Sequence, residues 1–397
     1  MTKLASPHPQ RRITVAHIIT SLDNGGAEAM LAKVVKQSNH VRFHHVVIAL
    51  KSRGHWGRSI EESGIELHAL AMSTPWSLPF ALISLYRHLK RIRPDILQTW
   101  LYHADFLGTL MRWALPIPTL IWNFRCSNMD LRQYPFHTRF IFKILAMLSS
   151  VPNIVFVNSH QGLAHHQKCG FHPRRWHLIP NGFDVSHFAP NESRRDALRR
   201  ELGLPLESRL IIFPARFDVM KDHETFLRAA KIVAGKRDDV YFVLAGKDID
   251  EKNSTLLRLI KELSLQSKVV LLGERNDIAN ILPGVDVVGL SSAFGEGFPN
   301  ILGEAMACAV PCVASDVGDI RDIAAQTGII VPPRDPQAMA AAWCKTLDLP
   351  AEERHKLGDM ARNRIRDNYS IETVTAMYEE IYEQMPISDP FPPKGQV

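Results

Sequence analysis

Residues 210–246 of the chain read LIIFPARFDVMKDHETFLRAAKIVAGKRDDVYFVLAG. The apolar run Leu210–Pro214 predicts a buried strand, and the amphipathic stretch His223–Val233 predicts a helix. A second apolar run, Tyr241–Ala245, predicts the next strand. A strand, a helix and a strand in this order form a crossover unit whose two strands pair in parallel. We therefore expect a parallel sheet that is covered by helices.

The same alternation extends along the whole chain. In the first half we predict strands at 14–19, 45–49, 66–69, 96–98, 119–123 and 153–158, and helices at 28–37, 57–62, 79–91, 104–113 and 137–148. In the second half we predict strands at 210–214, 241–245, 269–272, 286–290, 311–314 and 328–331, and helices at 223–233, 253–263, 278–281, 300–309, 320–325, 351–366 and 371–384. The segment 179–193, rich in Pro, Asn and Gly, separates the two sets.

The predicted fold class is therefore α/β, with two doubly wound, Rossmann-like domains that face each other across a cleft. We expect an amino-terminal domain at residues 1–183 and a second domain at 184–367. Residues 368–397 should form a closing helix and a loose, Pro-rich tail. A length of 397 residues agrees with two hydrophobic cores, since single cores stop growing near 250–300 residues.

Composition and charge narrow the class of protein. Apolar residues make up 46% and charged residues 22% of the chain, which excludes collagen-like and disordered proteins. The five cysteines are odd in number and favour a reducing compartment. Neither a secretory signal nor a membrane-spanning segment is expected. Residues 1–190 hold 21 Lys and Arg against 9 Asp and Glu, which suggests an anionic partner or simply a solvated basic surface.

Loops that leave the carboxyl ends of parallel strands hold the ligands of such sheets. In the first of them, Gly25 and Gly26 follow a predicted strand and open a helix. Their backbone N–H groups can approach a phosphate or a sugar closely, although a plain strand-to-helix turn would also explain them. The pattern is not Gly-x-Gly-x-x-Gly.

Two further loops lie in the second half. Arg216 and Lys221 follow the strand Leu210–Pro214, where a guanidinium and an ammonium could hold a diphosphate. Glu296 lies on a Gly- and Pro-rich loop, and Glu304 follows about one turn into the next predicted helix. Carboxylates placed in this way can accept hydrogen bonds from sugar and ribose hydroxyls.

These residues together resemble the retaining, nucleotide-sugar-dependent glycosyltransferases of the GT-B fold, above all the large bacterial group that builds polysaccharides and lipopolysaccharides. The resemblance is carried by Gly-Gly-Ala-Glu at 25–28, Pro-Asn-Gly-Phe-Asp at 180–184, Arg216 with Lys221, and Glu296-x7-Glu304 within Gly-Glu-Gly-Phe-Pro-Asn. It extends from about residue 13 to about residue 384. It implies a donor bound mainly by the second domain, an acceptor bound mainly by the first, and a final helix that crosses back onto the first domain.

The resemblance also implies roles for single residues. Arg216 and Lys221 would stabilise the leaving nucleoside diphosphate, Glu304 would hold the ribose, and Glu296 would hold the transferred sugar. The implied catalytic set is His103, Arg216, Lys221 and Glu296, and the implied donor-binding set is Gly25, Gly26, Arg216, Lys221, Gly297, Phe298, Asn300 and Glu304. One departure is Ala309, where the family pattern usually has Gly. The donor is expected to carry uridine, which is the commonest base in the family.

No metal and no cofactor besides the nucleotide sugar is expected. Asp248-Ile249-Asp250 has the Asp-x-Asp form of metal-dependent transferases of another fold. It stands where this family has a Gly-rich loop, so we interpret it as a turn. The adjacent pairs His44-His45 and His165-His166 cannot share one helix face as ligands.

Basic amphipathic segments in the first half predict contact with an anionic membrane surface. The segment 76–93 alternates apolar side chains with cations, and the segment 124–143 adds cations among aromatic residues. The patch assigned to acceptor or membrane consists of Arg87, Lys90, Arg91, Arg93 and Arg125. The alternative is that both segments are ordinary helices on a sheet with snorkelling cations. A cytoplasmic protein held at the inner face of the cell membrane is the expectation, with no nucleic acid as partner.

Two other functions stay open. A UDP-sugar epimerase of the same fold would use the donor without an acceptor. A non-catalytic partner of another transferase would bind the nucleotide sugar only, but it would not need the intact set of Arg216, Lys221, Glu296 and Glu304. A nicotinamide dehydrogenase is disfavoured because the glycine fingerprint is missing.

Overall fold

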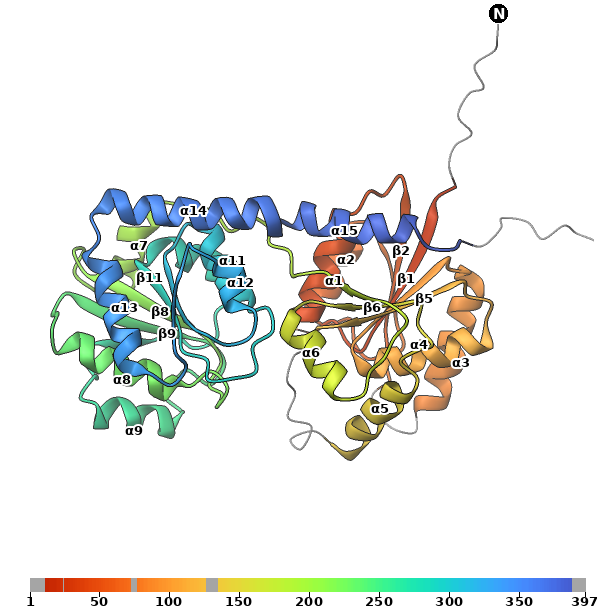
Figure 1. Cartoon of the computed structure of the whole chain (residues 1–397), viewed down its shortest axis with the longest axis horizontal. Coiled ribbons are helices and arrows are strands. Elements are labelled where there is room, and N and C mark those ends of the chain that lie inside the picture. The colour runs from red at the N-terminus through yellow and green to blue at the C-terminus, as the bar shows by residue number, and fades with distance from the viewer. Residues whose placement is uncertain (1–10, 24, 73–76, 126–134, 388–397) are drawn as a thin grey trace, which may run out of the picture. The chain divides into compact units, whose positions relative to one another are not determined.

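The computed structural model describes residues 11–23, 25–72, 77–125 and 135–387. The chain forms two compact units. Unit 1 consists of Met1–Gly182 and Val374–Val397, and unit 2 consists of Phe183–Thr373. Each unit contains one parallel sheet with helices on both faces, so the prediction of two doubly wound α/β sheets is confirmed (Figure 1).

The sheet of unit 1 has seven strands in the order β3-β2-β1-β4-β5-β6-β7. The central strand β1 pairs in parallel with β2 and β4, and Ile18 lies beside Ile48 and Thr99. The strands are β1 (Ile13–Ile19), β2 (Phe43–Ala49), β3 (Glu66–Ala69), β4 (Ile96–Trp100), β5 (Thr119–Phe124), β6 (Ile154–Val157) and β7 (Trp176–Leu178). The helices are α1 (Gly26–Gln37), α2 (Gly54–Glu62), α3 (Leu78–Ile92), α4 (Tyr102–Ala114), α5 (Phe136–Met147) and α6 (His160–Lys168).

The last helix of the chain, α15 (Ile371–Glu383), belongs to unit 1 from Val374 onward. Tyr378 and Tyr382 on this helix are fully buried. The Tyr382 hydroxyl donates to Gln98 Oε1, and Asn123 Nδ2 donates to the Tyr378 hydroxyl at 3.2 Å. The predicted return of the final helix to the first domain is therefore confirmed.

The sheet of unit 2 has six strands in the order β10-β9-β8-β11-β12-β13. The β-α-β unit around residues 210–246 forms as expected, and β8 pairs in parallel with β9 on one side and β11 on the other. The strands are β8 (Arg209–Pro214), β9 (Val240–Ala245), β10 (Val269–Leu271), β11 (Val287–Leu290), β12 (Cys312–Ser315) and β13 (Ile329–Val331). The helices are α7 (Ser193–Glu201), α8 (His223–Ala234), α9 (Ser254–Glu262), α10 (Ile278–Ile281), α11 (Asn300–Ala307), α12 (Ile320–Ala324), α13 (Pro336–Asp348) and α14 (Ala351–Tyr369).

Four elements of the fold are absent from the sequence-based expectations, namely α6, β7, α7 and α13. In α7, only Leu198 and Arg199 are buried, so this helix has no apolar periodicity to detect. In α13, the sequence carries two signals of a helix start: Asp335 caps the helix by accepting from Ala338 N, and Pro336 occupies the first turn. Helix α13 could therefore have been predicted, whereas α7 could not.

Ala309 lies in the left-handed region, with φ of 57°. It closes α11 in the arrangement that usually carries glycine: Val310 N donates to Ala305 O and Ala309 N donates to Met306 O, both at 3.0 Å. A glycine would adopt this conformation without a Cβ penalty. The departure from the family pattern therefore affects a helix end and removes no chemical group.

Candidate active site

The carboxyl edge of the sheet in unit 2 carries the two loops that the sequence singled out. One loop leaves β8 and ends at α8, and the other leaves β11 and ends at α11. Because β8 and β11 are paired in parallel, these loops start side by side. The Ser291 hydroxyl donates to the carbonyl oxygens of Lys221 and Asp222 at 3.0 Å, which joins the loops.

Lys221 and Glu296 meet between these two loops. Lys221 Nζ forms an ion pair with Glu296 Oε1, and the Ser292 hydroxyl donates to the same oxygen at 2.6 Å. The two side chains are only 15% and 9% exposed. A charged pair that is largely removed from water in this way holds both groups in fixed positions. The sequence assigned both residues to the site, but it did not indicate that they pair.

Arg216 is more exposed and has a separate support. Its Nε donates to Asp218 Oδ2 at 3.0 Å, and its side chain is 54% exposed. Asp218 also accepts from Met220 N at 2.8 Å. Burial raises the pKa of Asp218, but the hydrogen bonds from Met220 and Arg216 outweigh it and lower that pKa overall. The ionised Asp218 thus keeps the guanidinium on the loop without burying it.

The remaining residues of the implied donor set lie around the start of α11. Pro299 is the N-cap, Asn300 is the first helical residue, and Glu304 follows about one turn later and is half-buried. Phe298 is 8% exposed and its ring packs against Phe183 and Tyr369 in the core of unit 2. The Phe298 side chain therefore fixes this loop in the core of unit 2.

Gly297 and its neighbours are closely packed by the loop after β12. The Gly297 carbonyl accepts from Asp319 N at 3.1 Å. A Cβ at Gly318, where φ is 63°, would lie 2.1 Å from Glu296 O. Gly318 is therefore required for this loop to pass beside Glu296, a requirement that no sequence motif indicated.

In unit 1, Gly25 and Gly26 begin α1 as expected. Gly25 is the N-cap, and Ala29 N donates to its carbonyl at 3.0 Å. A Cβ at Gly25 would lie 2.2 Å from Glu28 Oε2, because this carboxylate folds back over the helix start. Burial raises the pKa of Glu28. The position next to Gly25 is thus taken by a carboxylate in this structure.

His103 is the second residue of α4 in unit 1. Its ring lies 5.9 Å from that of His137. Burial, and then the charges of His137 and Lys51, lower the pKa of His103. The ring is therefore neutral near pH 7 and suited to hydrogen bonding with a sugar hydroxyl.

The structure places four residues of the predicted basic patch on or next to α3, and the fifth elsewhere. Arg87, Lys90 and Arg91 of α3, and Arg93 directly after it, are exposed. On the same helix Leu78, Phe80 and Ile83 are exposed by 40%, 76% and 49%. The predicted segments 76–93 and 124–143 also include Trp76 and residues 126–134, which lie outside the described residues. Among the helices described, none is both long and apolar enough to cross a membrane.

Arg125 does not lie on this exposed patch, in contrast to the grouping made from the sequence. Its Nε donates to Asn123 Oδ1 and its Nη1 to Asn181 Oδ1, both at 2.9 Å. The guanidinium stacks over Trp100 and Tyr378, and its Nη2 is buried without a partner among the described residues. Burial lowers the pKa of Arg125 to about 9. The sequence could not indicate this orientation, because a cation at a strand end looks the same in sequence whether it points outward or inward.

Asp248 and Asp250 serve local structure. Asp248 adopts φ of 61°, and Asp250 accepts from Lys252 N at 2.9 Å within one turn. Among the described residues, no group of three or more His, Cys, Asp and Glu is arranged to hold a metal ion.

Comparison with known proteins identifies the family. Residues 194–364 match the glycosyl transferases group 1, and residues 24–187 match glycosyltransferase family 4. These matches cover the greater part of both units, and the chain belongs to this family of glycosyltransferases. The suspected relationship is thereby confirmed.

Individual relatives agree with this result. The chain is 27% identical over 241 residues to the UDP-Gal:α-D-GlcNAc-diphosphoundecaprenol α-1,3-galactosyltransferase of Escherichia coli, which covers 60% of this chain and 62% of that protein. It is 30% identical over 189 residues to the N-acetyl-α-D-glucosaminyl L-malate synthase of Bacillus anthracis, which covers 47% of this chain and 48% of that protein. The chain thus matches less than two thirds of the length of these curated relatives.

Among solved structures, Anabaena HepE in complex with UDP superposes with a TM-score of 0.81 at 18% identity. The superposition covers 94% of this chain and 100% of that one. The likeness confirms the GT-B fold.

Proposed function

We propose that the chain is a retaining glycosyltransferase that moves a sugar from a UDP-sugar to a glycan or lipid-linked acceptor in the synthesis of bacterial surface polysaccharides. The observation that carries this proposal is the Lys221–Glu296 pair beside Arg216 at the carboxyl edge of the sheet in unit 2. Family membership supports the reaction class. The donor and the acceptor class are supported by the name of the E. coli relative, which includes UDP-Gal and a diphosphoundecaprenol acceptor.

The proposed roles of Lys221 and Arg216 follow from where negative charge develops during the reaction. As the bond between the sugar and the diphosphate breaks, negative charge grows on the leaving phosphate. The Lys221 ammonium and the Arg216 guanidinium can both contact that phosphate, and neither has to be ordered at the moment of reaction, since Glu296 and Asp218 already hold them. The departing phosphate would then assist removal of the proton from the incoming hydroxyl on the same face, which gives retention.

Glu296 is proposed to hold the transferred sugar, and Glu304 the ribose. Glu296 Oε1 is occupied by Lys221 and Ser292 in this structure. A carboxylate accepts at both of its oxygens, so its Oε2 can still bind a sugar hydroxyl. His103, neutral near pH 7, is proposed to face the sugar from unit 1.

A direct test uses the full chain with UDP-galactose, UDP-glucose or UDP-N-acetylglucosamine, with and without a sugar-diphosphoundecaprenol acceptor. We expect UDP release from one donor only when the acceptor is present, a product with the anomeric configuration of the donor, and a rate that EDTA leaves largely unchanged. An altered UDP-sugar without acceptor would favour the epimerase. Donor binding without any turnover would favour the non-catalytic partner, and abolition by EDTA with rescue by Mn²⁺ would contradict the metal-independent mechanism.

We also propose that α3 and α5 attach the protein to the inner face of an anionic membrane. The exposed cations Arg87, Lys90, Arg91 and Arg93 accompany the exposed apolar side chains of α3. Helix α5 adds Phe136, Phe140 and Met147, exposed by 78%, 55% and 77%. Apolar side chains next to cations are the composition of helices that lie in a lipid interface. A surface of this kind would bring the enzyme to a lipid-linked acceptor.

Replacing Arg87, Lys90, Arg91 and Arg93 together with Gln should weaken binding to phosphatidylglycerol vesicles strongly and leave UDP binding intact. The attraction is worth about 1 kcal/mol for each cation near the surface and fades with salt. Vesicle cosedimentation at low and high salt measures it. A matched control removes four exposed cations on or directly before other helices of unit 1, Lys36, Arg53, Arg58 and Lys168. Equal losses in the two variants, or no vesicle binding by the unaltered protein, would contradict this surface.

A further inference from the structure

A cavity of about 580 Å³ opens at the amino edge of the sheet in unit 2. Asp286 lines it directly before β11, and Pro311 lines it directly before β12. Because the strands are parallel, this edge is opposite to the one that carries Lys221 and Glu296. Helix α11 begins beside the loop of Glu296, and the residues after its other end, Cys308 to Pro311, line the cavity. The cavity is thus separate from the proposed donor site.

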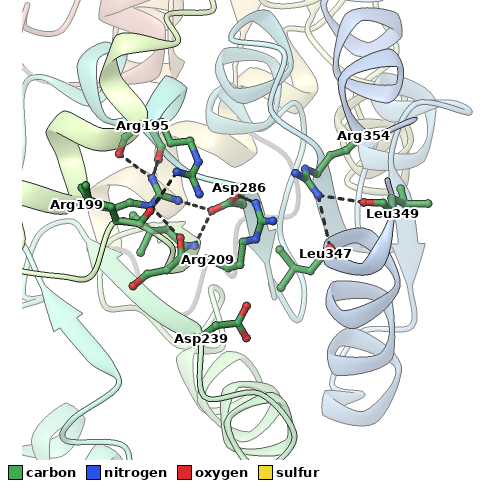
Figure 2. A network of polar contacts seen from close by, with 12 residues as sticks. Arg195, Arg199, Arg209, Asp239, Asp286, Leu347, Leu349 and Arg354 are labelled. Carbon is green, nitrogen blue, oxygen red and sulfur yellow. Dashed lines mark hydrogen bonds and ion pairs between the residues drawn. The ribbon is translucent and has the colours of Figure 1, made fainter. Parts of the chain in front are cut away.

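Four arginines gather around one buried carboxylate beside this cavity (Figure 2). Asp286 Oδ2 accepts from Arg199 Nη2 at 2.6 Å and from Leu210 N at 2.8 Å, and Asp286 Oδ1 accepts from Arg209 Nη1 at 3.0 Å. Arg199 is fully buried and also donates to the carbonyls of Arg195, Ser208 and Gly284. The Asp286–Arg199 pair is therefore a closed structural unit that needs no ligand.

The other three arginines are not neutralised in this way. Arg354 donates through Nη1 to the carbonyls of Leu347 and Leu349, at 3.5 and 3.2 Å, and pairs with no carboxylate among the described residues. Arg209 shares Asp286 with Arg199. Within the described chain, Arg195 forms its one ion pair with Asp196, at 3.3 Å with a side chain 48% exposed, where water screens the pair.

Repulsion from these like charges acts on Arg354. The pKa of Arg354 is lowered first by burial and then by the charge of Arg209, and Arg195 lowers it further, whereas Asp286 raises it. An anion placed among the three guanidinium groups would remove this repulsion. Arg195, with a side chain 36% exposed, and Arg354 both line the cavity, so a solute in the cavity can reach them.

The chemistry of the cluster specifies the ligand. Guanidinium groups bind phosphate through two parallel hydrogen bonds, and within the described chain the Nε and Nη2 atoms of Arg209 and Arg354 have no partner. The cavity volume lies in the range of small-molecule sites, about 300–1,000 Å³. Glu192, His355 and Asp359 line the cavity as exposed side chains and can bind hydroxyl groups.

We propose that this cavity binds a small phosphate-bearing molecule, with Arg195 and Arg354, which line it, against the phosphate. Arg209, which is held by the lining residue Asp286, adds positive charge nearby. The site is independent of the donor diphosphate that Arg216 and Lys221 are proposed to bind.

Isothermal titration calorimetry with glucose 6-phosphate, inorganic phosphate and glucose tests the proposal. We expect both phosphates to bind and glucose not to bind, and the ratio of the two phosphate affinities tells whether an ester or free phosphate is preferred. Binding should persist in the double variant Arg216→Ala/Lys221→Ala, which disables the proposed donor site. Loss of binding in that double variant would overturn the separate site.

Arg354→Gln should weaken phosphate binding about tenfold or more, since a charge-assisted, two-point contact is lost. Arg195→Gln, at a side chain that is 36% exposed, should also weaken it, and this variant carries the test if Arg354→Gln unfolds. The matched control is Arg258→Gln, an exposed arginine of α9 whose side chain is 73% exposed. The absence of phosphate binding in the unaltered protein, or equal affinities in Arg195→Gln and Arg258→Gln, would overturn the proposal.

Discussion

Replacing Lys221 with Ala is expected to lower kcat by about 10²–10³-fold, the effect of removing one preorganised charge from a transition state. The Lys221 ammonium is 15% exposed and fixed by Glu296, so it acts with little water between it and the leaving phosphate. Steady-state rates of UDP release with a saturating donor measure the effect. The control is Lys252→Ala, which removes an exposed lysine of the same unit.

Because Lys221 pairs with Glu296, the effect of Lys221→Ala on activity has to be separated from its effect on stability. Glu296 is 9% exposed, and removal of Lys221 leaves its carboxylate with Ser292 as the one remaining donor among the residues described. An unpaired, buried carboxylate can destabilise the fold by itself. The double variant Lys221→Ala/Glu296→Gln removes that charge, and thermal unfolding shows whether stability returns. Because Glu296 is itself proposed to hold the sugar, this double variant tests stability only. A low kcat in Lys221→Ala, measured well below its own thermal midpoint, would assign the loss of activity to chemistry.

Arg216 provides the complementary measurement. Its side chain is 54% exposed, so Arg216→Ala should leave the thermal midpoint unchanged. The same substitution should lower kcat by about 10²-fold, since its guanidinium is proposed to contact the same phosphate. Turnover at the unaltered rate in either Arg216→Ala or Lys221→Ala would contradict the diphosphate assignment.

A feature of the structure could be predicted from the sequence where its signal is local, and could not where it depends on residues far apart in the chain. The β-α-β unit at 210–246 was predictable because periodicity is local and strong. The loops with Arg216, Lys221 and Glu296 were predictable because they follow buried strands and match a family pattern. Their pairing was not, because it depends on how two loops, 75 residues apart in the chain, are joined through Ser291 and Ser292.

The cavity at the opposite edge was beyond sequence reasoning for the same reason. Its arginines come from α7, the start of β8 and α14, and each by itself looks like a solvated surface charge. Only Asp286, which brings Arg199 and Arg209 together, shows that they form a cluster. A polar network of residues far apart in the chain leaves no periodic signature.

Acid should destabilise the protein well above the pH at which carboxylates titrate. Burial lowers the pKa of His17 to about 3, and of His166 and His223 to about 4. The ordinary pKa of histidine is 6.5, so below pH 6.5 these rings bind protons in the unfolded chain but stay neutral in the folded chain. The stabilisation is fully present above pH 6.5 and is lost as the pH falls toward 4. For each of these histidines, the free energy of unfolding falls by about 1.4 kcal/mol for every pH unit below 6.5, or by about 2 kcal/mol at pH 5.

Hydrogen bonds fix the tautomer of the neutral His17 ring. Trp100 Nε1 donates to His17 Nδ1 at 3.3 Å, and His17 Nε2 lies 2.9 Å from His45 Nδ1. With Nδ1 accepting, His17 Nε2 carries the proton and donates to His45, whose own Nε2 faces Ser38 Oγ at 2.8 Å. The Ser38 hydroxyl in turn donates to Glu379 of α15 at 2.6 Å. A second proton on His17 would break the bond from Trp100, so acid should loosen unit 1 around this chain.

The two units should respond unequally, because His17 and His166 lie in unit 1 and His223 lies in unit 2. Hydrogen exchange in urea at pH 7, 6 and 5, read by mass spectrometry, reports the stability of each unit separately. We expect unit 1 to lose more stability than unit 2, because His45, whose pKa burial also lowers well below 6.5, lies in unit 1 as well. Both ring nitrogens of His223 are buried without a partner among the described residues, and its ring packs on Phe213 at 4.7 Å. His223→Phe should therefore cost little stability at pH 7. It should also reduce the loss of stability between pH 7 and pH 5 in unit 2 alone. The same loss in unit 2 with and without the substitution would contradict the role given to His223.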